Sequence, residues 1–174
     1  MERNKFDPSK ESQHMQYQVS QMNAVRRSFV LSAIALGGAF FTNAASARTT
    51  TIQVWKDPNC GCCKDWISHL GKNGFQVAAL DQGNNAARSR LGMPQKFASC
   101  HTALIDGYVI EGHVPAEDIK RMLEEKPQAL GLAVPGMPIG SPGMDGPAYG
   151  KRRDAYQVLL IQKDGSSKVF NSYL

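Results

Sequence analysis

The chain has 174 residues, of which 42% are hydrophobic, and a formal net charge of +5. From residue 48 onward, 15 Lys and Arg residues stand against 12 Asp and Glu residues, which leaves a net charge of +3 for 127 residues. This mild basicity, without a basic stripe or interleaved aromatic residues, argues against a nucleic-acid partner. The length is that of one domain.

The N-terminal segment is predicted to be an export signal. An apolar run over residues 30–41 follows Arg26-Arg27 and precedes Ala45-Ser46-Ala47, which is the order of a basic region, an apolar region and an A-x-A cleavage site. The run is shorter than the roughly 20 residues that span a membrane, so no stable membrane anchor is expected. The paired arginines suit either a twin-arginine signal or an ordinary secretory signal. We interpret residues 1–47 as a signal peptide cleaved after about Ala47, and residues 48–174 as a periplasmic domain.

The first predicted elements of this domain are a strand, a helix and a strand. Residues 51–55 alternate branched, polar and aromatic side chains as a strand does, and Asp57-Pro58-Asn59 then supplies turn residues. From Cys63 to Leu70, apolar residues recur at intervals of three and four, which is the period of a helix. Residues 75–80 are predicted to form the second strand.

The next predicted elements are a short helix, a hairpin and a longer helix. The short helix is expected to end near Leu91, and residues 102–111 form a hairpin around Asp106-Gly107, a strong two-residue turn signal. Pro115 opens a helix with one apolar face. The predicted order is strand, helix, strand, helix, strand, strand, helix.

The C-terminal part is predicted to be a loop followed by a hairpin. Residues 130–150 are rich in Gly, Pro and Met, a composition that disfavours a helix. Residues 156–161 and 169–173 are expected to form a terminal hairpin around Asp164-Gly165.

Four cysteines carry the chemistry that the sequence indicates: Cys60, Cys62, Cys63 and Cys100. Unprotected thiols in an oxidising compartment tend to become disulfides, but adjacent cysteines such as Cys62 and Cys63 rarely pair with each other. A metal site or a redox site therefore explains the spacing better than a structural disulfide with two spare thiols. The first three cysteines lie at a predicted helix start, where backbone N–H groups favour the thiolate, the form that acts as nucleophile and as metal ligand.

Clustered thiolates are ligands for soft ions, namely copper(I), zinc or an iron–sulfur cluster. Structural zinc sites usually take their cysteines from two well-separated pairs, whereas here three cysteines occupy four positions. We therefore predict a copper(I) site in which thiolates bridge more than one ion, with zinc as the less favoured metal. Secondary candidates, as ligands or as partners of the cysteine ligands, are His101, His113, Met137 and Met144. Each methionine is more readily explained as a loop anchor over the core, and a lone histidine is more often structural.

The element order, with a cysteine motif between the first strand and the first helix, resembles the thioredoxin fold. Cys60-Gly61-Cys62-Cys63-Lys64 resembles the thioredoxin Cys-Gly-Pro-Cys-Lys loop with cysteine in place of proline. Ser99-Cys100-His101-Thr102 then takes the place of the facing loop, so Cys100 would lie opposite the other sulfurs and His101 would replace the usual cis-proline. The resemblance implies an α/β fold with a thioredoxin-like central mixed sheet flanked by helices, extended by a C-terminal Gly/Pro/Met loop and an added β-hairpin.

Four ordered blocks together resemble one family. They are KDPNCGCCK at residues 56–64, SCHTA at 99–103, EGHVPA at 111–116 and VPGMPIGSPGM at 134–144. On these blocks the chain is similar to the CopG-like family of periplasmic metal-binding proteins. The resemblance implies a periplasmic location, a role in copper resistance, and a copper cluster with Cys60, Cys62, Cys63 and Cys100 as ligands.

Three hypotheses follow for the function. The leading one is a copper(I)-binding protein that sequesters copper or hands it to other envelope copper-handling proteins, with no enzymatic activity expected beyond a redox change at the copper site. The alternative is a thiol–disulfide oxidoreductase that uses Cys60 and Cys63, which the histidine at position 101 disfavours. The third is a structural zinc domain that acts as a binding module.

Overall fold

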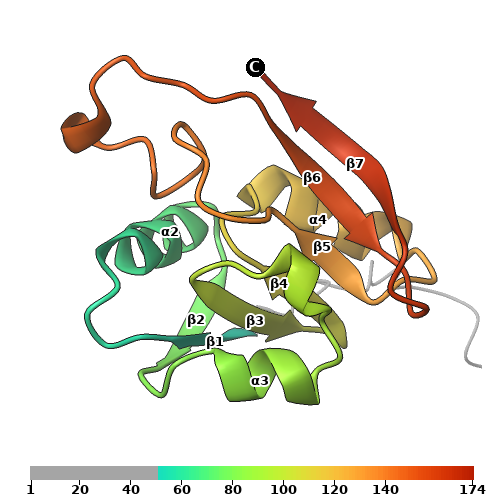
Figure 1. Cartoon of the computed structure of the whole chain (residues 1–174). Coiled ribbons are helices and arrows are strands. Elements are labelled where there is room, and N and C mark those ends of the chain that lie inside the picture. The colour runs from blue at the N-terminus through green and yellow to red at the C-terminus, as the bar shows by residue number, and fades with distance from the viewer. Residues whose placement is uncertain (1–50) are drawn as a thin grey trace, which may run out of the picture. The chain divides into compact units, whose positions relative to one another are not determined.

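The computed structural model describes residues 51–174, so the predicted signal peptide, residues 1–47, lies outside the described residues. Within this range the chain has a mixed α/β fold, with one seven-stranded mixed sheet in the order β2-β1-β3-β4-β5-β6-β7 and three α-helices (Figure 1). None of these helices is long and apolar enough to cross a membrane. The elements are β1 (Thr51–Lys56), α2 (Gly61–Lys72), β2 (Gln76–Leu80), α3 (Asn85–Arg90), β3 (His101–Ile105), β4 (Tyr108–Glu111), α4 (Ala116–Glu125), β5 (Gly131–Ala133), β6 (Tyr156–Ile161) and β7 (Ser167–Tyr173).

The first seven elements confirm the predicted order. Strands β1 and β2 are parallel and joined by α2, and β3 and β4 form an antiparallel hairpin beside β1. The hairpin turns at Asp106 and Gly107, whose φ angles are both positive, 46° and 82°. Positive φ at both central residues is the geometry of a type I′ turn, which an Asp-Gly pair favours. Helix α4 begins directly after Pro115, as predicted.

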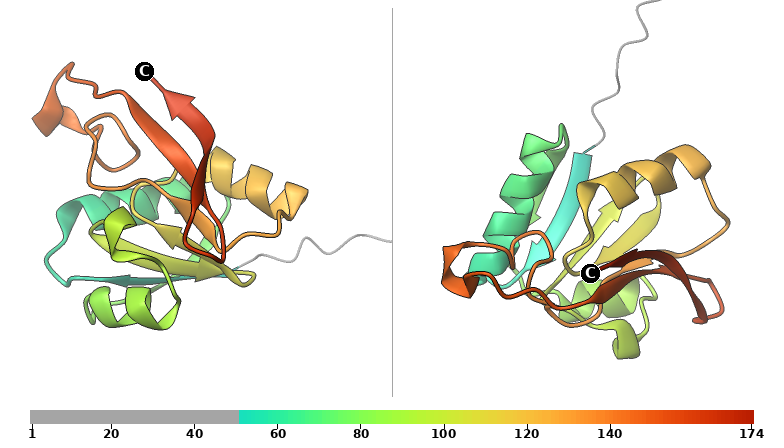
Figure 2. Two further views of the ribbon diagram at one scale, coloured as in Figure 1. Left: turned by 45° about the vertical axis from the view of Figure 1, so that its right-hand side comes forward. Right: turned by 90° about the horizontal axis from the view of Figure 1, so that it is seen from above.

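Strand β5 corrects the prediction that residues 130–150 form a continuous loop. It pairs in parallel with β4 and antiparallel with β6, so the terminal hairpin of β6 and β7 continues the main sheet. A three-residue strand is too short for alternation of side chains to reveal it, and its stability comes from hydrogen bonds to strands on both sides. The remaining loop, residues 134–150, passes beside α2 (Figure 2).

Two apolar clusters lie on the two faces of the sheet. The larger cluster packs α2 and α4 against the sheet and includes Trp66 and Ile119, both fully buried. The smaller cluster includes Phe97, which follows α3. Because successive side chains of a strand point to opposite faces, Ile110 belongs to the first cluster and Val109 to the second. The larger cluster therefore holds α2, which carries Cys62 and Cys63, against the sheet.

Candidate metal centre

The first turn of α2 positions three of the four cysteines. The Asp57 carbonyl accepts a hydrogen bond from the Cys60 backbone N–H at 3.1 Å, which closes the turn between β1 and the helix. The helix begins at Gly61, two residues earlier than predicted, and Cys60 is its N-cap residue. The Cys60 sulfur accepts a hydrogen bond from the backbone N–H of Cys63 at 3.3 Å. Cys62 and Cys63 follow within the same turn, so the three sulfurs share the N-terminal end of one helix.

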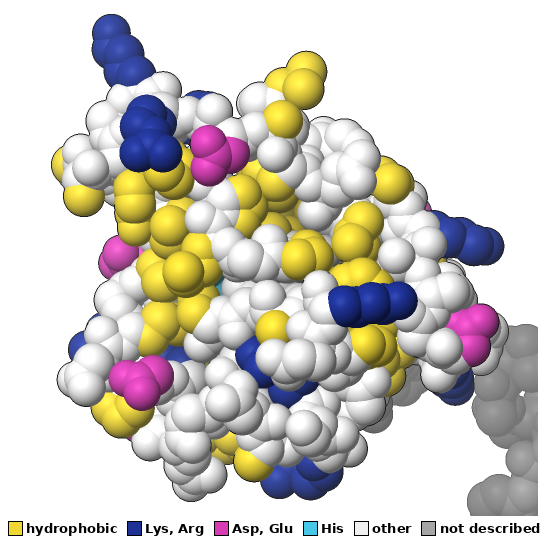
Figure 3. Space-filling model, viewed as in Figure 1, with side chains coloured by type: hydrophobic (Ala, Val, Ile, Leu, Met, Phe, Trp, Pro, Cys, Tyr) yellow, Lys and Arg dark blue, Asp and Glu magenta, His cyan; other side chains and the backbone are white. Residues whose placement is uncertain are grey.

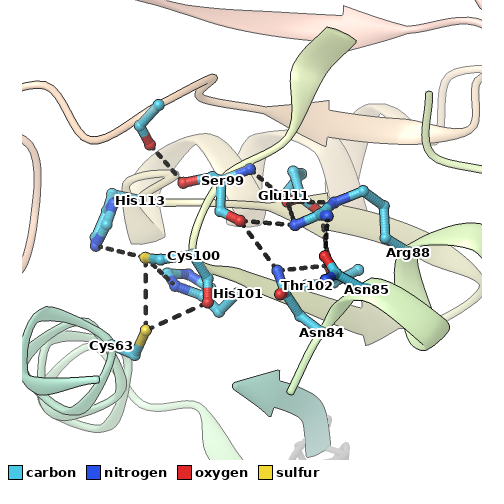
Figure 4. A network of polar contacts seen from close by, with 11 residues as sticks. Cys63, Asn84, Asn85, Arg88, Ser99, Cys100, His101, Thr102, Glu111 and His113 are labelled. Carbon is cyan, nitrogen blue, oxygen red and sulfur yellow. Dashed lines mark hydrogen bonds and ion pairs between the residues drawn. The ribbon is translucent and has the colours of Figure 1, made fainter. Parts of the chain in front are cut away.

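Cys100 reaches the same place from another part of the chain, because it directly precedes β3, which pairs with β1. Its Sγ lies 3.5 Å from Cys63 Sγ and 3.8 Å from Cys62 Sγ. Cys62 Sγ in turn lies 3.6 Å from Cys60 Sγ. All four sulfurs are within 4.8 Å of one another, and Figure 4 shows Cys63 and Cys100 facing each other. The structure thus brings together the four cysteines that were predicted as ligands.

Two of these sulfurs are bonded to each other. Cys60 and Cys63 form a disulfide, while Cys62 and Cys100 are free thiols. A disulfide sulfur is not a thiolate and is therefore not available as a thiolate ligand. The cluster accordingly has two states that differ by two electrons and two protons: one disulfide with two thiols, or four thiols.

Around the Cys60–Cys63 disulfide, the other close sulfur contacts have nearly the spacing of a soft-metal site. A metal–sulfur distance of about 2.3 Å in a tetrahedral site places neighbouring sulfurs about 3.8 Å apart. The three non-bonded sulfur contacts measure 3.5, 3.6 and 3.8 Å. The set contains only cysteines, and thiolate donors select copper(I) and zinc over hard cations such as magnesium or calcium.

Two buried histidines adjoin Cys100. Its sulfur lies 3.4 Å from His101 Nδ1 and 3.6 Å from His113 Nε2 (Figure 4), and the three residues form a second set of donor atoms within 4.8 Å. Burial, and then the neighbouring His113, holds the pKa of His101 well below its ordinary value of 6.5, and burial lowers the pKa of His113 to about 4. Both rings are therefore neutral at pH 7, the form in which imidazole binds a metal.

The outer nitrogens of these rings are unsatisfied. Among the described residues, His101 Nε2 and His113 Nδ1 are buried side-chain atoms without a hydrogen-bond partner. The His101 ring packs against the Trp66 ring with a centroid separation of 4.2 Å and the ring planes tilted by 34°, and the Trp66 indole N–H donates to the Val114 carbonyl at 2.8 Å. A buried polar atom without a partner is costly. The nitrogens that the two rings offer to the centre are the other ones, His101 Nδ1 and His113 Nε2, which adjoin the Cys100 sulfur.

The protonation of Cys100 differs from that expected at a helix start. Burial, and then the nearby Cys62, raises the pKa of Cys100 to about 12. The thiol therefore keeps its proton at neutral pH, and a metal ion has to displace that proton to bind the sulfur. Unlike Cys62 and Cys63, Cys100 is not a residue of α2 but directly precedes β3.

The two methionines predicted as secondary ligands lie in different environments. Met144 is 8% exposed and its sulfur accepts a hydrogen bond from the Tyr149 hydroxyl at 3.3 Å, whereas Met137 is 51% exposed. Their loop packs tightly on α2, since a Cβ added to Gly143 would lie 2.6 Å from the Cys62 carbonyl oxygen. Hydrophobic side chains gather over this part of the molecule in Figure 3. The loop covers the cysteine-bearing end of α2, with Met144 packed inward.

A buried ion pair next to the centre was not predicted. Arg88 on α3 and Glu111 at the end of β4 contact each other through Nη2 and Oε1 at 2.9 Å, with side chains 3% and 0% exposed. One sequence signal was present, because Glu111 ends a predicted strand in which the preceding residues are apolar. An acidic residue in such a place needs a partner.

Comparisons with known proteins find one family model and two solved structures. Residues 97–144 match a family described as "Protein of unknown function, DUF411". Two solved structures are similar to the chain. The first, "Copper resistance protein copG- Form 2", is 50% identical, with 72% of this chain and 98% of that chain covered and a TM-score of 0.66. The second, "Copper resistance protein copG- Form 1", is 51% identical, with 71% and 96% covered and a TM-score of 0.65. Among curated proteins there is no match.

Proposed function

The chain belongs to the family of the copper resistance protein CopG, and from this premise we propose that it is a periplasmic protein that binds copper(I) through Cys60, Cys62, Cys63 and Cys100. The single observation that carries the proposal is the convergence of the four sulfurs within 4.8 Å. Copper is the cargo in this proposal. The protein sequesters it, or passes it to other envelope proteins that handle copper, and so contributes to copper resistance.

The composition of the site favours copper(I) over zinc. A structural zinc site is complete with four ligands in a closed tetrahedron, whereas this centre has further donors beside it. The neutral rings of His101 and His113 adjoin Cys100, so a second ion can share that sulfur. Copper(I) is a soft ion with a single positive charge, and thiolates that bridge such ions allow the chain to bind more than one of them.

The chain's own residues prepare the sulfurs for the ion. The N-cap position of Cys60 places its sulfur on the backbone N–H of Cys63. Once the disulfide is reduced, that hydrogen bond and the positive end of the α2 dipole favour the thiolate. Cys100 supplies a fourth sulfur and gives up its proton when the ion binds.

The disulfide of Cys60 and Cys63 favours a second candidate function, which is a redox reaction at the same centre. Oxidation of the two thiols releases two electrons and two protons, and two copper(II) ions take up those electrons to become copper(I). The return step needs a two-electron reductant, such as a partner dithiol. Exchange of the same disulfide with protein substrates is the oxidoreductase alternative. His101 disfavours this oxidoreductase alternative, because a thioredoxin-like oxidoreductase is expected to have proline at that position.

The thioredoxin-like description and the periplasmic location belong to the proposal. The order β1-α2-β2-α3-β3-β4-α4, with the cysteine motif between β1 and α2, supports the first. The export signal predicted for residues 1–47 supports the second.

Metal analysis of the protein, purified anaerobically from the envelope of the producing cells, tests the proposal. We expect copper in excess of zinc, with more than one copper ion per chain if thiolates bridge. A single zinc ion per chain with no copper would instead identify a structural zinc domain. Absence of metal, together with insulin disulfide reduction that survives both Cys62→Ser and Cys100→Ser, would identify an oxidoreductase.

A further inference from the structure

A buried carboxylate lies behind the loop that carries Cys100 (Figure 4). Glu111 Oε1 accepts a hydrogen bond from the Ser99 backbone N–H at 2.7 Å, and Oε2 accepts one from the Thr102 hydroxyl at 2.6 Å. Oε1 also accepts from Arg88 Nε and Nη2 at 3.0 and 2.9 Å. One side chain therefore holds the residue before Cys100 and the second residue after it.

Arg88, the cation of the ion pair with Glu111, binds the carbonyl end of Ser99. The Ser99 carbonyl oxygen accepts hydrogen bonds from Arg88 Nη2 at 2.6 Å and from Asn84 Nδ2 at 3.0 Å. Arg88 Nη1 donates to Asn85 Oδ1 at 2.8 Å, which fixes the guanidinium on α3. Both polar groups of the Ser99 backbone are thus bound to buried side chains. Because the Ser99 carbonyl carbon is bonded to the nitrogen of Cys100, these contacts set the direction in which Cys100 leaves the loop.

Stability alone is a weak explanation for a pair in this position. Removing two charges from water consumes much or all of their mutual attraction, and apolar residues of equal volume often serve a fold as well. What apolar residues cannot supply is a set of directional, charge-assisted hydrogen bonds. Here those bonds converge on Ser99 and Thr102, the residues on either side of the Cys100–His101 segment.

We propose that Arg88 and Glu111 are positioning residues for the metal centre, which fix the backbone around Cys100 so that its sulfur stays 3.5 Å from that of Cys63. This inference rests on the proposed function, because copper binding by the centre requires the four sulfurs to lie close together. The geometry itself can be measured without any metal.

Disulfide formation between Cys63 and Cys100 measures how well the two sulfurs are held together. In the full-length C60S/C62S variant only these two cysteines remain. Oxidised glutathione converts the two thiols into one disulfide and is itself reduced to two molecules of glutathione. Thiol trapping and mass spectrometry give the equilibrium constant, which is the effective concentration of one thiol at the other. We expect Glu111→Gln to lower this effective concentration by roughly tenfold or more, since a hydrogen bond to a charged group typically contributes at least that factor.

A matched control removes a carboxylate charge elsewhere. Asp118 is 2% exposed and accepts hydrogen bonds from Asn171 Nδ2 at 2.9 Å and from the Tyr173 hydroxyl at 2.7 Å. Asp118 joins α4 to β7 and contacts none of the four cysteines. Like Glu111→Gln, Asp118→Asn therefore removes one carboxylate charge from a buried side chain, but away from Cys100. Should Glu111→Gln fail to fold, Thr102→Val removes the hydroxyl that donates to Glu111 Oε2 and accepts from Asn84 Nδ2 at 3.4 Å, and it is expected to lower the effective concentration by a smaller factor.

The outcomes separate this inference from the proposed function. A lowered effective concentration in Glu111→Gln or Thr102→Val, with an unchanged value in Asp118→Asn, supports positioning. Values equal to that of the C60S/C62S parent, or an equal loss in Asp118→Asn, overturn it. If the wild-type protein binds no copper, the proposed function fails, yet the glutathione measurement still decides whether the ion pair positions Cys100.

Discussion

The sulfur of Cys100 lies 3.5 Å from the sulfur of Cys63, although 37 positions separate the two residues in the chain. The sheet register explains this contact. Lys56, the last residue of β1, pairs with His101, the first residue of β3. In an antiparallel pair the end of one strand lies beside the start of the other. The turn after β1 and the residue before β3 therefore lie side by side, at the same end of the two strands. The cysteine centre is a consequence of that register.

The oxidation state of Cys60 and Cys63 is expected to control the copper capacity. With their disulfide intact, two of the four sulfurs are not available as thiolates, so oxidised protein should bind less copper(I) than reduced protein. Anaerobic copper(I) titration before and after treatment with a phosphine reductant measures the difference. Equal capacity in the two states would contradict the assignment of these two cysteines as ligands.

The stability of the fold is expected to depend on pH through His69, which caps α4. His69 Nε2 accepts a hydrogen bond from the Ala116 backbone N–H at 3.1 Å, so the bond needs a neutral ring. Burial is the main cause that lowers the pKa of His69 from 6.5; Glu117 and Asp145 oppose the shift, and Lys120 and Lys72 add to it. Because the folded pKa lies below the unfolded one, this contribution to stability is complete above pH 6.5 and is lost as the pH falls below that value.

Urea unfolding of wild-type protein and His69→Gln, at about pH 7.5 and about pH 5, on either side of the ordinary histidine pKa, tests this dependence. Glutamine keeps an acceptor oxygen but does not titrate in this range, so the free energy of unfolding should fall less on acidification in the variant. His69→Ala is expected to cost about 1 kcal/mol at the higher pH, as other helix-cap removals do. The same pH dependence in wild type and His69→Gln would show that the cap is not responsible.

The loop over α2 is expected to tolerate no side chain at Gly143. The φ angle there is +85°, and an added Cβ would lie 2.6 Å from the Cys62 carbonyl oxygen and 2.8 Å from Trp66 N. Gly136→Ala is the matched control, because its φ is +71° and nothing lies within 4 Å of the added atom. Calorimetry should show a loss of about 1–3 kcal/mol for the control, from backbone strain alone, and a larger loss for Gly143→Ala. Equal losses would mean that the loop moves freely off the helix.

Local signals in the sequence were sufficient for most of the fold. The Asp106-Gly107 turn and the apolar period of α2 each involve residues close together in the chain, so the pattern and the structure agree. Strand β5 was missed because its hydrogen bonds come from β4 and β6, and nothing within its three residues reveals those partners.

In the candidate site, too, features that depend on neighbouring residues could be predicted, and a contact between distant residues could not. Three cysteines are neighbours in sequence, and the place of Cys100 followed from the resemblance to a known fold, so their grouping could be predicted. The ion pair of Arg88 and Glu111 joins residues 23 positions apart, from a helix on one face of the sheet to the end of a strand. No short-range period records such a pairing, because it depends on how α3 packs against the sheet.

The number of copper(I) ions bound by reduced wild-type protein, compared with that bound by Cys62→Ser, tests the central claim most directly. Cys62 contacts both Cys60 and Cys100 through its sulfur and is not needed by a simple C-x-x-C exchange site. With both proteins purified from the envelope and titrated anaerobically, the account predicts fewer copper ions per chain in the variant. Equal copper binding in Cys62→Ser and wild type would contradict it.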